Sequence, residues 1–394
     1  MRRVIALACW LAAATASGLA HAQAFDIDAR APRFAPARAD DPPLDGRLPD
    51  AKEVAMPWVH GGRAGVAARI NDAIYLQLLD MLAPRAPGDT FTAPANGQLQ
   101  YFCDIGFSVG RNDGRVLSIQ MALGSLGSAH CSWYKSTLVF DARTGRELWW
   151  ADILTAPGRD ALIQHRNRTA IKANCEALAY LPPDPDDTDP PEGGTCAEVP
   201  PLRHAGPPPT READPNHPDD EQRQFFRGCI WDLERPDPHA QLEFEVPAEP
   251  GLSLPLHPCA GDNRHEIPID VTPEAVPIPV AELEPLLSAY GRRLLLGKGN
   301  APAPADLFGH TLRGHVGSAP ITLYLGRSWG EKNEMQATYA YDRIGTAITM
   351  FGNAAGDAIE LSEGDGKGFA LRRVGTSLVG TWHGNGKTLP VRLE

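Results

Sequence analysis

The clearest hydrophobic pattern in the chain is a stripe of apolar residues at every fourth position between residues 63 and 82. This spacing predicts a helix that turns one face toward a core. Pro84 should end it, because proline cannot continue a helix. Further helices are predicted over 160–180 and 280–290. The stripe consists of Val66, Ile70, Ile74, Leu78 and Leu82.

Between the first two helices, the chain has the composition of antiparallel strands joined by tight turns. Asn112-Asp113-Gly114 is a hairpin signal, and Asp141 to Gly145 has the composition of a second turn. Asp152 is expected to cap a helix. The predicted strands here are Leu99–Val109, Arg115–Leu123, Trp133–Phe140 and a return strand at Glu147–Trp150; one more strand, Ala240–Val246, is predicted beyond the second helix.

From Leu307 onward the pattern changes to short alternating segments separated by Gly, Asn and Asp. Such regular spacing predicts a meander of about eight strands, which would form a small barrel or a sandwich. The predicted strands are Thr311–Val316, Ile321–Leu325, Gln336–Tyr341, Ala347–Phe351, Ile359–Ser362, Phe369–Arg372, Leu378–Trp382 and Leu389–Leu393.

These patterns predict an α+β fold, in which an antiparallel sheet with two or three helices precedes a C-terminal all-β module. Residues 181–220 are rich in Pro, Asp and Glu and poor in apolar residues, so we expect an exposed insert there. The expected divisions are a leader over 1–24, an extended lead segment over 25–52, an α+β domain over 53–297, a linker over 298–304 and the all-β module over 305–394.

The first 24 residues have the features of a secretory signal peptide. Arg2 and Arg3 precede an apolar run, and Ala20-His21-Ala22 and Ala22-Gln23-Ala24 are both small-x-small cleavage patterns. A transmembrane anchor is the alternative, but the apolar run is short for one. The sequence therefore predicts export to the periplasm or beyond it.

Export would place the cysteines in an oxidising compartment, where disulfides form. Six of the seven cysteines follow the leader, and an even number in an exported chain predicts three disulfides. Six cysteines allow about 15 pairings. Their order suggests Cys103–Cys131, Cys175–Cys196 and Cys229–Cys259.

The chain is acidic, with a formal net charge of −12 from 49 acidic and 37 basic residues. Loss of the leader would also remove the positive charges of Arg2 and Arg3. This balance disfavours nucleic acid and anionic membrane surfaces as partners, and it favours encounter with cationic ones.

A family resemblance rests on the segment from Ser128 to Asp152 and on two flanks, Ala68–Ile74 and Val276–Leu283. The matching positions are Ser128, Ala129, His130, Phe140, Asp141, Thr144, Gly145, Glu147, Leu148 and Asp152. In pieces over about residues 53 to 290, the chain resembles the extracytoplasmic domain of RsiV-like anti-sigma factors. That domain, of unknown function, also accompanies PdaC-type peptidoglycan deacetylases. The resemblance implies an association with peptidoglycan or with proteins that act on it. The insert over 181–220 departs from the family pattern.

Few residues form a pattern that points to chemistry. His130 has no partnered nucleophile motif, so a hydrogen-bonded structural histidine is the favoured interpretation over a catalytic one. His257, Cys259, Asp262 and His265 are zinc-type ligands, yet an oxidising compartment would place Cys259 in a disulfide. The acidic run Asp184–Asp189 lacks the spacing of an EF-hand loop. We therefore predict no catalytic residue, metal or cofactor.

Aromatic residues of the C-terminal module are the other candidates. They could line a ligand cavity, although small barrels are more often filled by their own side chains. The aromatic positions are Tyr324, Trp329, Tyr339, Tyr341, Phe351, Phe369 and Trp382. The candidate ligand-binding residues are His130, Trp133, Tyr339, Tyr341 and Trp382.

The resemblance and the charge together predict an exported binding or envelope-sensing protein rather than an enzyme. Its expected partner is peptidoglycan or a cationic envelope-active protein, with no nucleic acid and no membrane span once the leader is removed. Two alternatives stay open: a small-molecule carrier that uses the C-terminal barrel, and a hydrolase built around His130.

Overall fold

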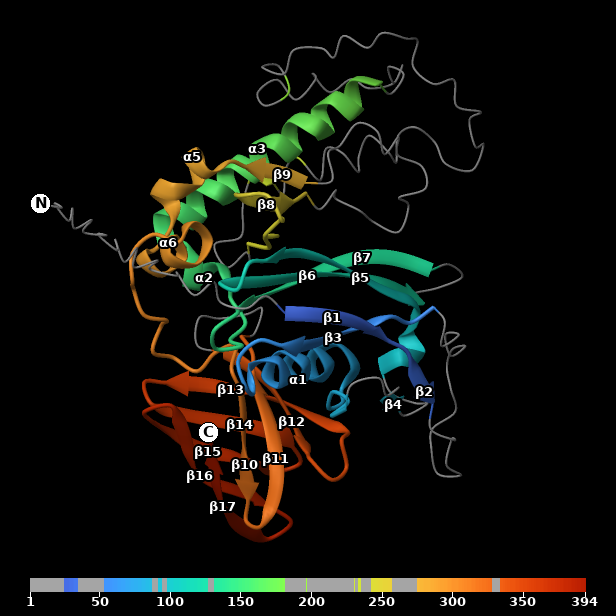
Figure 1. The fold of residues 1–394 in the computed structure, drawn as a ribbon, viewed down its shortest axis with the longest axis vertical. Helices are drawn as coiled ribbons and strands as arrows, with labels where there is room; N and C mark the ends of the chain where they lie inside the picture. Colours follow the sequence, from blue (N-terminus) through green and yellow to red (C-terminus); the bar gives the residue numbers. More distant parts are fainter. Residues whose placement is uncertain are drawn as a thin grey trace, which may run out of the picture.

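The structure is a computed structural model that describes residues 25–34, 53–86, 91–93, 98–126, 131–180, 196, 230, 233–234, 242–256, 275–327 and 334–394. It confirms the α+β class: helices lie around an antiparallel sheet, and a closed β-barrel follows at the C-terminal end (Figure 1). The leader lies outside the described residues, as does almost all of the insert. Within the described residues, no helix is long and apolar enough to cross a membrane.

The central sheet has three antiparallel strands in the order β5-β6-β7. These are β5 (Phe102–Asn112), β6 (Val116–Leu126) and β7 (Cys131–Asp141), each within a few residues of its predicted range. The predicted turn joins β5 to β6: Gly114 adopts φ 74°, and Asp113 Oδ1 accepts hydrogen bonds from the backbone N–H groups of Arg115 and Val116. Alternation along β6 directs Leu117, Ile119 and Met121 to one face of the sheet.

That face is covered by α1 (Val66–Leu79), whose predicted stripe supplies Val66, Ile70 and Ile74 to the core. The helix ends at Asp80 in the left-handed conformation, four residues before Pro84. Beside it, β3 (Met56–Gly61) pairs with β1 (Phe25–Arg30). The start of the expected lead segment is therefore a paired strand, with Phe25 buried in the core. Two short strands, β2 (Pro32–Phe34) and β4 (Phe91–Ala93), pair in parallel, and a 3-10 turn, η1, spans Gln98–Tyr101.

The opposite face carries a second core, to which helices, short strands and their connections all contribute (Figure 1). The longest helix begins at Ala156 rather than Asp160, because the Thr155 hydroxyl accepts a hydrogen bond from the N–H of Gly158. The third helix predicted over 280–290 is divided into shorter helices. The last of them, α6, starts after Ser288. The elements are α2 (Trp150–Ile153), α3 (Ala156–Tyr180), β8 (Leu252–Pro255), β9 (Ala275–Ile278), α5 (Val280–Leu283), η4 (Glu284–Leu286) and α6 (Ala289–Leu296).

Two predictions in this region need correction. The expected return strand at Glu147–Trp150 is reduced to an isolated bridge between Phe140 and Glu147, because Trp150 already begins α2. Asp152 caps a helix as expected, but from the first turn of α2 rather than from ahead of it: its carboxylate accepts a hydrogen bond from the N–H of Trp149, the residue before α2. Of the strand expected near Ala240–Val246, the described part makes a bridge from Glu245 to Ser253.

The C-terminal module is a closed barrel of eight antiparallel strands, so the structure decides for a barrel over a sandwich. The first strand pairs with both the second and the last, and the pairs Gly314–Leu393 and Val316–Val391 close the barrel. All eight predicted strands are present. They are β10 (Thr311–Val316), β11 (Ala319–Leu325), β12 (Glu334–Tyr341), β13 (Ala347–Ala355), β14 (Ala358–Gly364), β15 (Lys367–Val374), β16 (Ser377–Gly384) and β17 (Lys387–Leu393).

The barrel is docked on the rest of the chain through its outer wall. The Thr311 hydroxyl donates to the Arg69 carbonyl at 3.1 Å, and Arg313 pairs with the buried Asp72 at 2.7 Å. Tyr324 and Ala340 belong to the core that α1 covers, not to the interior of the barrel. The barrel and the α+β part therefore share a core.

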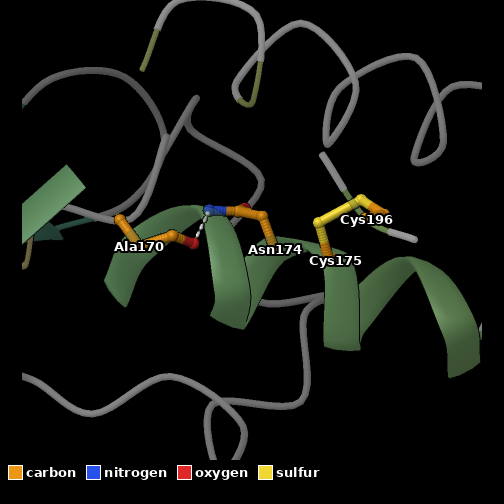
Figure 2. Close-up of a disulfide and its surroundings, with 4 residues drawn as sticks. All are labelled: Ala170, Asn174, Cys175 and Cys196. Carbon is orange, nitrogen blue, oxygen red and sulfur yellow. Dashed lines mark hydrogen bonds between the residues drawn. A yellow bond between two sulfur atoms is a disulfide. The ribbon is translucent and has the colours of Figure 1, made fainter. Parts of the chain in front are cut away.

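Two of the three predicted disulfides lie in the described residues. Cys103 and Cys131 join β5 to β7 across β6, with Cα atoms 6.2 Å apart. Gly124 of β6 lies under this bridge, where a Cβ would approach both sulfur atoms to within 2.8 Å. Figure 2 shows the second bridge, in which Cys175 of α3 is bonded to Cys196 of the insert. Cys229 and Cys259 lie outside the described residues.

Candidate functional site at one end of the barrel

Three of the five predicted ligand-binding residues meet in the barrel. Tyr339 and Tyr341 come from β12 and Trp382 comes from β16, all at inward positions of the alternating strands. Trp133 belongs to β7 of the central sheet, where its backbone pairs with Gly124. His130 lies outside the described residues. The five residues therefore do not form one site.

The barrel residues converge on a carboxylate that sequence reasoning missed. The Tyr339 hydroxyl and the Trp382 indole N–H both donate to Glu363 Oε1, at 2.8 and 2.6 Å. Glu363 comes from β14, two residues after the inward-facing Leu361, so alternation along that strand could have revealed it. The ring of Tyr339 also makes an edge contact with that of Tyr341, with centroids 5.6 Å apart.

The arrangement has a clear electrostatic consequence. Buried tyrosine hydroxyls and indole N–H groups need an acceptor, and Glu363 supplies one to both. Burial raises the pKa of Tyr339 well above its ordinary value, and the hydrogen bond to Glu363 adds to the rise, so Tyr339 stays a donor. Glu363 and Tyr341 are half-buried, and no cationic side chain among the described residues forms an ion pair with Glu363. One end of the barrel thus presents an oriented negative charge beside an aromatic ring.

The other aromatic candidates have structural roles or lie elsewhere. Phe369 packs in the barrel interior with its centroid 5.1 Å from that of Tyr339. Phe351 points outward and is 62% exposed, and Tyr324 faces α1. Trp329 lies outside the described residues. Leu, Ile, Met and Val side chains occupy the rest of the interior, so the barrel is filled by its own side chains in the described part of the chain.

The part of the family-resemblance segment that follows β7 connects the sheet to the barrel. Arg146 is fully buried and donates to Asp152 at 2.6 Å and to Asp306 at 3.0 Å. Asp141, also fully buried, accepts hydrogen bonds from the Tyr290 hydroxyl at 2.7 Å and from Arg293 at 3.2 Å. These charged residues join β7, α6 and the approach to the barrel, which is a structural role.

The zinc-type residues His257 to His265 and the acidic run Asp184–Asp189 lie outside the described residues. Within the described ranges, no group of three or more His, Cys, Asp or Glu side chains could hold a metal ion.

No family model matches the chain, and no curated protein matches it.

Proposed function

We propose that this chain is an exported, non-enzymatic binding protein of the cell envelope that recognises a cationic partner protein. The observation that carries the proposal is the Glu363 carboxylate at the barrel end, which Tyr339 and Trp382 orient and which forms no ion pair with the described residues. A lysine or arginine side chain of the partner would meet this charge next to the Tyr341 ring. Carboxylates and aromatic rings both attract such groups.

Two further features support the proposal. The net charge of −12 would steer a basic protein toward the chain and raise its association rate at low ionic strength. The two disulfides suit an exported protein, because such bonds persist in oxidising compartments such as the periplasm. The resemblance to RsiV-like domains favours a partner that acts on peptidoglycan, such as a basic muramidase.

The packed interior of the barrel argues against the alternative of a small-molecule carrier. A carrier would need an open cavity of roughly 300 Å³ or more, whereas Leu323, Met350 and Phe369 fill the interior together with their neighbours. The proposed contact instead lies at the end of the barrel.

Binding of the full chain to a basic muramidase, measured by calorimetry at low and at high ionic strength, tests the proposal. Glu363→Gln keeps an acceptor oxygen for Tyr339 and Trp382 but removes the charge. We expect it to weaken binding by about tenfold, the effect of losing roughly 1.4 kcal/mol. Glu360→Gln on the outward face of the same strand is the matched control and should change affinity little.

Two results would refute the proposal. One is the absence of binding even at low ionic strength. The other is an equal loss of affinity in the Glu363 and Glu360 variants, which would show that net charge rather than the barrel end is recognised.

A further inference from the structure

Glu147 is a buried carboxylate where three parts of the chain meet. Its carboxylate accepts hydrogen bonds from Gln77 of α1, at 2.8 Å, and from the hydroxyl of Tyr324 on β11. Its backbone N–H donates to the carbonyl of Gly309, just before β10, at 2.8 Å. Glu147 therefore connects α1, the segment after β7 and the outer wall of the barrel.

The backbones at this contact are close together. Gly309 has φ 74°, and a Cβ there would lie 2.3 Å from the Glu147 carbonyl oxygen. Tyr324 is 3% exposed and Glu147 is 6% exposed, so water has little access to their hydrogen bond. Any charge on Glu147 must therefore be stabilised by its protein neighbours.

We propose that Glu147 is a proton-operated lock, which holds the barrel against α1 when its carboxyl group is protonated and loosens this contact when it ionises. As a neutral acid, Glu147 fits the two neutral donors that surround it. As an anion, it would keep the same two hydrogen bonds, but no cation among the described residues pairs with it to offset the cost of burial.

Two arginines near the lock are already paired, and the nearby histidine is neutral. Arg146, the adjacent residue, is bound to Asp152 and Asp306. Arg327, after β11, lies 3.7 Å from the other oxygen of Asp306. His310, beyond Gly309, has its pKa lowered to about 4 by burial and by Arg146, so it is neutral near pH 7.

The direction of the effect follows from the same surroundings. Burial raises the pKa of Glu147 from its ordinary 4.5 to about 7; the hydrogen bonds from Tyr324 and Gln77 oppose the rise, and Asp152 adds to it. Glu147 is therefore protonated while the barrel is held against α1, and it releases the proton when this contact opens. The lock is tightest below the ordinary pKa and is lost as the pH rises through about 7.

Hydrogen exchange of the full chain at about pH 5.5 and about pH 8, corrected for intrinsic exchange rates, tests this lock without any ligand. Protection of α1 and β11 should fall by about 30-fold between these conditions, given a pKa of about 7 when locked and 4.5 when open. β15 and β16, on the far side of the barrel, should change less.

Two variants make the test specific. Glu147→Gln is a neutral isostere and should abolish the pH dependence at α1 and β11. Tyr324→Phe removes a hydrogen bond that stabilises the anion, so it should move the transition to higher pH. The exposed Glu360→Gln should behave as the wild type.

The proposal is overturned if wild-type protection at α1 and β11 is the same at both pH values, or if Glu147→Gln shows the wild-type fall. An unchanged transition in Tyr324→Phe would overturn it as well, even if Glu147→Gln failed to fold. None of these results bears on the binding proposed for Glu363.

Discussion

Replacing Arg146 by methionine removes a fully buried charge from between the sheet and the barrel. The guanidinium is 2.6 Å from Asp152, whose side chain is 1% exposed, and 3.0 Å from Asp306, whose side chain is 37% exposed. Methionine fills a similar volume without a charge. Asp152 would then keep a hydrogen bond from the N–H of Trp149 but lose the arginine with which it is paired.

The expected loss of stability is large. Breaking a buried ion pair by removing one partner typically costs about 3–5 kcal/mol, because the remaining charge is buried without compensation. Arg392→Met removes an ion pair whose side chains are 72% and 62% exposed, and it should cost less than about 1 kcal/mol. In the double variant Arg146→Met with Asp152→Asn, most of the loss should be recovered, with a coupling energy above about 1 kcal/mol.

The loss should also depend on pH. Burial already raises the pKa of Asp152 above its ordinary value, and Arg146 opposes that rise. In Arg146→Met the pKa of Asp152 rises further, so the folded protein keeps the proton to higher pH. The variant should therefore be closest to the wild type in mild acid, and the difference should grow as the pH rises through the new pKa.

Urea unfolding followed by tryptophan fluorescence, at about pH 5 and about pH 8, measures these free energies. Trp149 and Trp150 lie directly beside the altered contact. A cost below about 1 kcal/mol for Arg146→Met, or strictly additive effects in the double variant, would contradict the reasoning, since either would mean that Asp152 is not held by Arg146.

Two further predictions concern local packing. Gly124→Ala would place a Cβ within 2.8 Å of the sulfur atoms of Cys103 and Cys131, so thiol labelling and mass analysis should find both cysteines reduced; an intact bridge would contradict the prediction. Ser288→Ala removes the hydroxyl that accepts a hydrogen bond from the N–H of Gly291, and it should destabilise the protein by about 1 kcal/mol in urea unfolding; an unchanged midpoint would show that this cap is dispensable.

The local signals in the sequence were most reliable in the barrel. All eight strands were predicted, because alternation and turn residues such as Gly317 and Gly356, both with positive φ, act over a few residues. The helix predicted from the apolar stripe of α1 was correct for the same reason, because the stripe shows which face of that one helix is buried.

The segment after β7 shows where such reasoning fails. Glu147 to Trp150 has the composition of a strand, yet the backbone at Glu147 bonds to Gly309 near the barrel, and Trp150 begins α2. Residues far away in the chain decide its conformation. Phe25 is a similar case, since the strand it begins exists because β3 is available for pairing.

The sequence by itself determined the class of the fold, the strands of the barrel and the main helical face, and it suggested the two cysteine pairs that the structure contains. Each of these depends on a repeating local pattern or on the order of a few residues. Only the tertiary structure decided that the barrel closes, that its outer wall docks on α1, and that Glu363 meets Tyr339 and Trp382. These features depend on which distant segments share a core, and local periodicity shows that a face is buried without showing what covers it.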